Sequence, residues 1–280
     1  MVRHAISALV LATLALSAST ATAQPAWQFR FQKGQDLVYR VRHQTAVTEI
    51  VQGSASESAS TLDVVKRWKF TDVDAAGTAT MDLSIERMRN EQKRPGGEVL
   101  LFDSANLDKS TPELKGMAKF LGTTIASIRV DKHGRVVEVK AGPKAKYEAE
   151  PPFVVVLPEA QAAAGQSWSR PFTISLDPPL GTGEKHEAEQ VSACSKIEVG
   201  KATLTVTTKL KAAPESPQEL VPLVQKLLQG QVVIDLTAGR IESVQLAVDR
   251  TVENHQGKGS SYRFRTTYAE TYMPDGLLGR

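Results

Sequence analysis

The sequence contains few of the residues that usually mark a protein's chemistry. Its 280 residues include one cysteine, so no internal disulfide can form. Aromatic residues make up only 6%, which excludes an extended set of stacking platforms for bases. Lysine and arginine number 34 against 31 acidic residues, and this near balance points to no nucleic-acid partner. The cysteine, Cys194, lies in an alternating segment and is expected as a small buried side chain, with an intermolecular disulfide open if it is exposed.

Motifs for metals, cofactors and catalysis are also missing. None of the four later histidines has a second ligand at a metal-site spacing; they are His43, His133, His186 and His255. The segment that begins at Asp72 starts like a calcium loop, but a leucine stands where that loop needs glutamate. Neither a glycine-rich phosphate loop nor a Gly-x-Ser-x-Gly elbow occurs. We therefore expect no metal ion, no cofactor and no recognisable catalytic residue.

The first 23 residues have the three parts of a secretory signal peptide. A basic start is followed by the apolar run 5–17 and by the small-x-small sequence Ala21-Thr22-Ala23. The run is too short to cross about 30 Å of hydrocarbon, which disfavours a membrane anchor. A bacterial lipid anchor would need a cysteine directly after the cleavage site, where Gln24 stands. We expect cleavage after Ala23, export to the periplasm or the extracellular space, and no transmembrane segment afterwards.

Alternation of apolar and polar residues dominates the chain after residue 24 and predicts antiparallel strands. Two segments change to the helical period. Each opens with a capping box, Ser110-Thr111-Pro112-Glu113 and Ser216-Pro217-Gln218-Glu219, and each should end at a glycine, Gly122 and Gly230. Pro222 should kink the second helix or push its regular start later. The apolar stripes of the two helices comprise Leu114, Met117, Leu121, Leu220, Val224, Leu227 and Leu228.

The order of strands, helix and hairpin occurs twice, which predicts an internal duplication. We divide the chain into a signal peptide (1–23), a first β-rich repeat (24–140), a linker (141–152), a second β-rich repeat (153–273) and a flexible tail (274–280). The predicted fold class is α+β, mostly β: two tandem curved antiparallel β-sheets, each with one short amphipathic helix. The two halves are expected to pack side by side or to share a continuous sheet.

Three segments carry a resemblance to a family. The opening Phe31–Tyr39 and the hairpins Val73–Ala79 and Val130–Val136 resemble exported bacterial proteins known only as a domain of unknown function. The resemblance covers most of the chain after the signal peptide, rests on turn chemistry, and implies no catalytic residues. A more distant similarity, in architecture alone, is to the periplasmic lipoprotein-carrier fold, a curved sheet closed by helices around an apolar groove.

Three functions fit these observations. The first is a non-enzymatic binding or carrier protein, with an apolar ligand between the helix stripes and the sheets, although the same side chains can simply fill the core. The second is a cell-envelope module that contacts a partner protein through exposed strand edges. The third is a hydrolytic enzyme whose site is not visible in the sequence, and it ranks last because no catalytic constellation is found. We therefore expect an exported carrier, with an apolar small molecule or an envelope protein as its partner.

Overall fold

The computed structural model describes residues 27–274, so the predicted signal peptide lies outside the described residues. The strands are β1 (Asp36–Val51), β2 (Ser54–Val73), β3 (Ala79–Lys93), β4 (Val99–Asp103), β5 (Thr124–Val130), β6 (Val136–Ala141), β7 (Ser167–Leu176), β8 (Glu184–Glu198), β9 (Lys201–Leu210), β10 (Gln229–Asp235), β11 (Arg240–Glu253) and β12 (Ser261–Met273). The helices are η1 (Leu107–Lys109) and η2 (Pro112–Phe120), both 3-10, and α1 (Lys144–Ala149) and α2 (Pro217–Val224).

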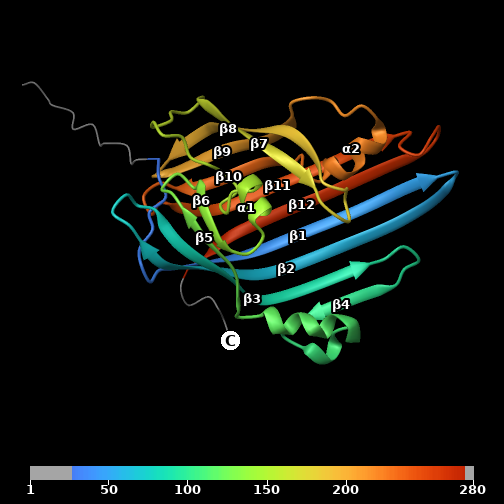
Figure 1. Ribbon diagram of the computed structural model, residues 1–280, viewed down its shortest axis with the longest axis horizontal. Helices are drawn as coiled ribbons and strands as arrows, with labels where there is room; N and C mark the ends of the chain where they lie inside the picture. The colour runs from blue at the N-terminus through green and yellow to red at the C-terminus, as the bar shows by residue number, and fades with distance from the viewer. Residues whose placement is uncertain (1–26, 275–280) are drawn as a thin grey trace, which may run out of the picture.

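All these strands belong to one antiparallel sheet (Figure 1). Its order is β6-β5-β3-β2-β1-β12-β11-β10-β9-β8-β7, and β4 pairs with β3 off this path. The mostly-β class is confirmed, and the two expected sheets are joined into one. They are joined because β12 pairs with β1 on one side and with β11 on the other.

The two sides of β12 show the same sequence of elements. From β1 to β6 and again from β7 to β11, three strands in a meander come first, and a helix followed by a hairpin comes last. In the first stretch β4 and η1 stand between the meander and the helix η2. Both sets run across the sheet in the same direction, so β1 and β11 flank β12. The boundaries of the two repeats remain a prediction.

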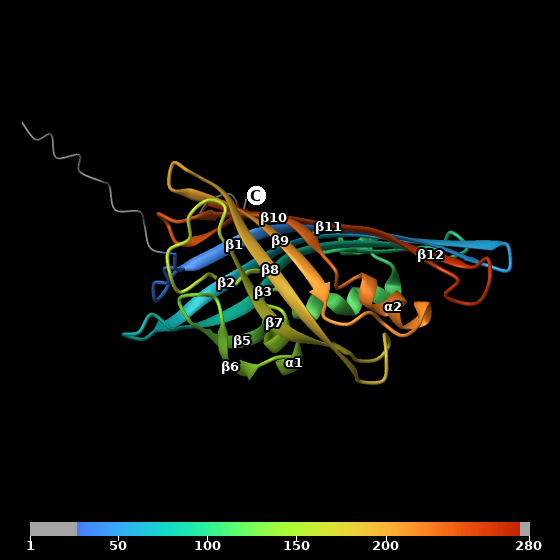
Figure 2. The same cartoon turned by 90° about the horizontal axis from the view of Figure 1, so that it is seen from above.

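The sheet is strongly arched (Figure 2). In that view β1, β11 and β12 form the top of the arch, and α1 and α2 lie on its concave side. Helix α1 contacts both β6 and β7, the two ends of the strand order, and so bridges them at one end of the molecule. At the other end the long strands β1, β2, β11 and β12 extend beyond their neighbours (Figure 1). The molecule thus has a closed end and an open end.

One hydrophobic core fills the closed end. It follows from the alternation: Leu37 and Tyr39 are buried, whereas Arg40 and Arg42 on the same strand are exposed. Cys194 belongs to this core and is 1% exposed, which confirms the expected buried side chain. Both halves contribute to the core, with Trp68, Phe70, Met81 and Ile128 from one and Leu204, Val232, Ile234 and Ile241 from the other.

The segment at residues 27–31 seals the closed end between two corresponding turns. The Phe29 N–H donates to the carbonyl of Lys132 (2.7 Å), and the Arg30 N–H donates to the carbonyl of Gly239 (2.9 Å). The β10–β11 turn needs its glycine because φ is +65° there and a Cβ would lie 2.5–2.7 Å from Arg30 atoms. Equivalent turns of the two halves therefore contact one segment.

The predicted linker is more ordered than its composition suggests. Helix α1 lies inside it and buries Tyr147. The following residues Phe153, Val155 and Leu157 lie in the core, where the ring of Phe153 packs 4.8 Å from that of Phe29, measured between centroids. The passage between the halves is thus a component of the core.

Candidate ligand-binding site

The site described here lies beside α2, at the open end of the sheet. The helix starts where the sequence predicts it, because the N-cap Ser216 accepts a hydrogen bond at Oγ from the Glu219 N–H (3.3 Å) and Pro217 follows it. The Glu219 carboxylate in turn accepts the Glu215 N–H (3.0 Å). The capping box at Ser216 is therefore confirmed, with its return bond one residue earlier than expected.

The helix ends earlier than predicted. It stops at Val224, with Pro222 inside it, and Leu227 and Leu228 lie beyond its last residue. Gly230 does not end it, because β10 begins at Gln229 and its residues already pair with β9 and β11. The predicted end at Gly230 is wrong for that reason.

Helix α2 is wedged between two parts of the sheet. Leu223 is fully buried against Ile174, Leu176 and Ala188 of β7 and β8. Val224 is fully buried against Val248, Val252 and Phe264 of β11 and β12. Leu220 packs against both clusters. Sequence reasoning missed Leu223, although its i+3 spacing from Leu220 was a usable signal.

A hollow of about 500 Å³ adjoins this helix. It exists because β10 is short: at its first residue, Gln229, it pairs with Thr207 of β9 and Ala247 of β11. Beyond that point none of the strands in residues 27–274 lies between β9 and β11, and α2, which contacts β11, lies beside the space. The apolar part of the lining consists of Leu210, Ala212, Ala213, Pro214, Leu220, Leu227 and Val248.

Of the four stripe residues predicted for the second helix, two line the hollow. Leu220 and Leu227 do so, and both are half-buried. Val224 and Leu228 instead pack in the cluster between α2 and β11 and β12. The sequence analysis left open whether these residues line a groove or fill the core. In this stripe two residues line the hollow and two pack in the core.

The polar part of the lining contains two cations and one carboxylate. Lys209 and Arg250 line the hollow and are exposed. Asp249 also lines it, but it accepts two hydrogen bonds from the Arg263 guanidinium, at 3.0 and 2.8 Å. These bonds hold the pKa of the Asp249 carboxyl below its ordinary value. The remaining polar lining residues are Thr207, Thr208 and Gln229.

The other predicted stripe lies elsewhere. Helix η2 contacts β4 and α2 contacts β11, and β3, β2, β1 and β12 separate those two strands in the sheet. No residue of η2 is buried, and Leu114 and Met117 are half-exposed. Leu121 follows the helix and forms an isolated bridge with Ile85. The two stripes therefore do not meet in one groove.

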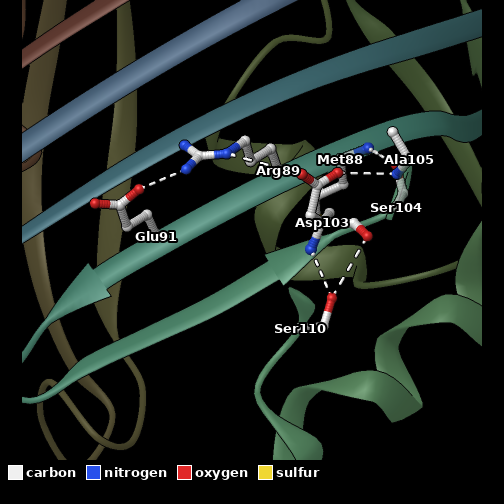
Figure 3. A network of polar contacts seen from close by, with 7 residues as sticks. All are labelled: Met88, Arg89, Glu91, Asp103, Ser104, Ala105 and Ser110. Carbon is white, nitrogen blue, oxygen red and sulfur yellow. Dashed lines mark hydrogen bonds and ion pairs between the residues drawn. The ribbon is translucent and has the colours of Figure 1, made fainter. Parts of the chain in front are cut away.

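The capping box predicted at Ser110 is wrong. The N-cap of η2 is Thr111, and no side chain caps the helix. Ser110 Oγ instead accepts the Asp103 N–H (2.9 Å) (Figure 3). Thr111 Oγ1 accepts the Leu101 N–H (2.9 Å), so both residues are hydrogen-bonded to β4. Because the two hydroxyls accept hydrogen bonds from amides of β4, they do not cap the helix.

A buried polar group lies on the concave side where β1, β2 and β12 meet. Lys66 Nζ is 2.9 Å from a Glu270 carboxylate oxygen, and Tyr268 donates its hydroxyl to the same carboxylate. Burial and the Glu270 charge raise the pKa of Tyr268 well above its ordinary value. These groups satisfy one another and join β2 to β12.

The histidine beside that group does not activate a nucleophile. His43 Nε2 lies 2.8 Å from Thr266 Oγ1, the pair from which a base and a hydroxyl nucleophile could be built. The Thr266 hydroxyl, however, donates to the carbonyl of Gln44 (2.9 Å), so it can only accept from the ring. The pair is thus a structural hydrogen bond.

Within residues 27–274, no three histidine, cysteine or acidic side chains gather as metal ligands would. None of the helices described by the structure has the length and hydropathy needed to cross a membrane.

Comparisons with known proteins assign no function to this site. No family model matches the chain, and no curated protein resembles it significantly in sequence. Among solved structures it is similar to lipovitellin, from a study of lipid–protein interactions, with a TM-score of 0.45 and 10% identity over 87% of this chain. The match spans 25% of that protein's length. A second, the Pseudomonas aeruginosa MucA/MucB complex, gives 9% identity and a TM-score of 0.11 over 86% of this chain and 90% of that one. Similarities of this size carry no functional argument.

Proposed function

We propose that this is an exported, non-enzymatic binding protein that holds an apolar ligand in the hollow beside α2. The observation that carries the proposal is the hollow itself, because it results from the fold and adjoins a well-packed helix. Its volume of about 500 Å³ falls in the range of small-molecule sites, roughly 300–1,000 Å³. Seven of its 13 lining residues are apolar and six are polar or charged, so an apolar chain can lie against one part of the lining and hydrogen-bonding groups against the other. Export rests on the N-terminal sequence pattern.

A ligand of this kind gains affinity from the apolar surface that it loses to the hollow. Each methylene group that leaves water contributes about 0.8 kcal/mol, which corresponds to about a fourfold change in affinity. We therefore expect a series of straight-chain alcohols to bind more tightly with each added carbon until the hollow is full. The measurement is displacement of a fluorescent apolar probe from the purified mature protein, with native mass spectrometry to identify any ligand that copurifies.

Variants of the lining test the location. Leu227→Asp places a charge in the hollow and should abolish binding of the alcohols, because an apolar chain cannot solvate the carboxylate. Leu220→Trp should fill the hollow and weaken binding without adding a charge. The matched control is Leu114→Asp, which changes an equally half-buried leucine of the other predicted stripe.

Three results would contradict the proposal. They are absence of any chain-length dependence in the wild type, equal loss in Leu114→Asp and Leu227→Asp, and full binding in Leu220→Trp. Urea unfolding of each variant shows that the protein tested is folded.

A further inference from the structure

The hollow exposes one unpaired edge of β11. Gln229, the first residue of β10, pairs with Ala247, and within residues 27–274 no strand lies beside β11 on that side after Ala247. On its other side β11 stays paired with β12 as far as Glu253. No other backbone group of the described chain bonds to Val248–Glu253 at the unpaired edge. This edge of six residues is about 20 Å long, and its first three residues line the hollow.

The lining of the hollow has two faces of different chemistry. Leu210 of β9 and Val248 of β11 belong to the clusters that pack around α2, so they lie on the concave face of the sheet (Figure 2). Side chains alternate along a strand, which places Lys209 and Asp249 on the opposite, convex face. A long ligand in the hollow therefore contacts apolar groups on one side and charged groups on the other.

The hollow follows the path that a longer β10 would take. If the register of β10 is continued, the second position before Gln229 falls between Lys209 and Asp249, and the third falls between Leu210 and Arg250. The chain itself does not fill these positions, because it enters β10 directly from the end of α2. Successive positions on this path face opposite sides of the sheet, as the residues of a strand do.

An extended peptide matches both the edge and the two faces. Its main chain carries N–H and C=O groups at the spacing of a strand edge, and its side chains alternate between two faces. A hydrocarbon chain offers no hydrogen-bonding partner to the edge of β11. A helical peptide uses its main-chain groups within the helix and so cannot pair with an edge. The lining therefore favours a strand as its occupant.

The convex face favours acidic residues on that strand. Glu189 lies opposite Lys209 in the β8–β9 register, but within the described part of the chain no ion pair joins them. Asp249, in contrast, is bonded to the guanidinium of Arg263. The unpaired charge that lines the hollow on this face is therefore positive.

From these observations we propose that the hollow binds an extended peptide segment of a partner protein, which adds to β11 as a strand with apolar residues toward α2 and acidic residues toward Lys209. This inference rests on the proposed function, because the apolar face of the peptide is the apolar ligand of that same site. The exposed charges of Asp249, Arg250 and Glu253 disfavour indiscriminate pairing along this edge, so a partner has to match it.

The first experiment compares two synthetic peptides of equal length and composition at pH 7. In one, valine alternates with glutamate; in the other, the same residues are ordered in pairs, so that neither face is uniform. We expect the alternating peptide to displace the fluorescent apolar probe from the mature protein, and the paired peptide to bind about tenfold more weakly or worse. Two further alternating peptides, N-methylated at the valines or at the glutamates, test the main chain. One of them should lose binding, because alternate N–H groups of a strand point to opposite edges.

Hydrogen exchange locates the contact. The alternating peptide should slow exchange at alternate amides within Val248–Glu253 by about tenfold or more, because these amides gain main-chain acceptors. The amides of β4, which belongs to the other half, should not change. Lys209→Glu should weaken binding of the alternating peptide about two- to fivefold, which is the size of one exposed charge pair. Lys185→Glu, the same change at an exposed lysine of β8 outside the lining, is the matched control.

The possible failures are distinguishable. If the paired peptide binds as well as the alternating one, if both N-methylated peptides bind normally, or if exchange in β11 does not slow, this inference is overturned. The proposed function still stands in that case, provided that the alcohols bind. If neither the peptides nor the alcohols bind, the proposed function itself fails. Equal losses in Lys209→Glu and Lys185→Glu would contradict the place given to the acidic residues.

Discussion

The regions around α2 and η2 occupy the same place in the order of elements but differ in their surroundings. Each helix comes after a three-strand meander and before a hairpin, although β4 and η1 stand between the meander and η2 in the first half. Helix α2 buries Leu223 and Val224 completely, whereas η2 buries none of its residues. The same sequence device, a short helix with an apolar stripe, thus produces a packed wedge in one half and a surface turn in the other.

The difference follows from one inserted strand. Strand β3 pairs with β5 at Ala79–Ser84 and then with β4 at Arg89–Lys93. Strand β9 pairs with β10 only as far as Thr207, and the space beyond is left to α2 and the hollow. In the first half β4 supplies the backbone partners that would otherwise be missing, so η2 is displaced beyond the edge of the sheet. Among the described residues, the hollow beside α2 is therefore linked to the absence of a strand like β4 there.

The strongest test of this comparison is truncation of one leucine in each helix. Leu223→Ala should reduce the free energy of unfolding by about 2–5 kcal/mol, because the side chain is fully buried and its removal leaves a cavity. Leu114→Ala in η2 should cost about 1 kcal/mol or less, because that side chain is already half-exposed. Urea unfolding at equilibrium measures both. Equal losses would mean that η2 also packs as a wedge.

The two Ser-x-x-Glu boxes give a second test. Ser216→Ala should cost about 1 kcal/mol by removing the helix cap. Ser110→Ala should cost a similar amount for another reason, since it leaves the Asp103 N–H of β4 without its acceptor. Hydrogen exchange separates the two causes: the Glu219 amide should exchange faster in the first variant and the Asp103 amide in the second. If the amides of η2 exchange faster in Ser110→Ala, then Ser110 does cap that helix and our interpretation of its role is wrong.

Sequence reasoning predicted the parts of the fold that depend on local patterns. The alternation in Leu37–Val51 became β1, and turn glycines such as Gly134 and Gly239 adopt the positive φ expected of them. The same reasoning predicted the start of α2 from Ser216 and Pro217. These features need only neighbouring residues, so one sequence contains enough information for them.

Features that depend on distant pairing could not be predicted in this way. Ser110 satisfies an amide of β4 because that strand lies beside it, and a local pattern cannot distinguish this role from a helix cap. The hollow depends on where β10 begins relative to β9 and β11, which is a property of register. Leu210 and Val248 lie 38 positions apart and line the same hollow only because of that register, so no sequence motif marks the candidate site.

Two hairpin turns offer a smaller test of the two halves. Gln52-Gly53 and Val199-Gly200 both have positive φ at each residue, as a type I′ turn requires. A β-branched residue suits that conformation poorly, and Val199 is fully exposed, so its side chain gains nothing from packing. Val199→Asn should therefore stabilise the protein by about 0.5–1 kcal/mol, and Gln52→Asn by about half as much or less. Val199→Thr is the control, because it removes the apolar surface but keeps the branch; a gain there would refute the conformational explanation.

The smallest effect concerns the seam between the halves, where His43 of β1 faces β12. Burial lowers the pKa of His43 below its ordinary value, so the folded state disfavours the protonated ring. The neutral ring's contribution is therefore fully present above pH 6.5, the ordinary value, and is lost as the pH falls through the lower folded-state pKa. In the His43→Gln variant, the glutamine can still donate a hydrogen bond to Thr266 but does not titrate. The unfolding free energy of this variant should therefore fall less than that of the wild type between pH 7 and pH 5. Parallel urea titrations at each pH measure the difference, and His186→Gln, a half-buried histidine on β8 away from the seam, is the control. Identical pH dependence in wild type and His43→Gln would show that the seam tolerates a charged ring, and that the two halves are joined there less tightly than the hydrogen bond to Thr266 indicates.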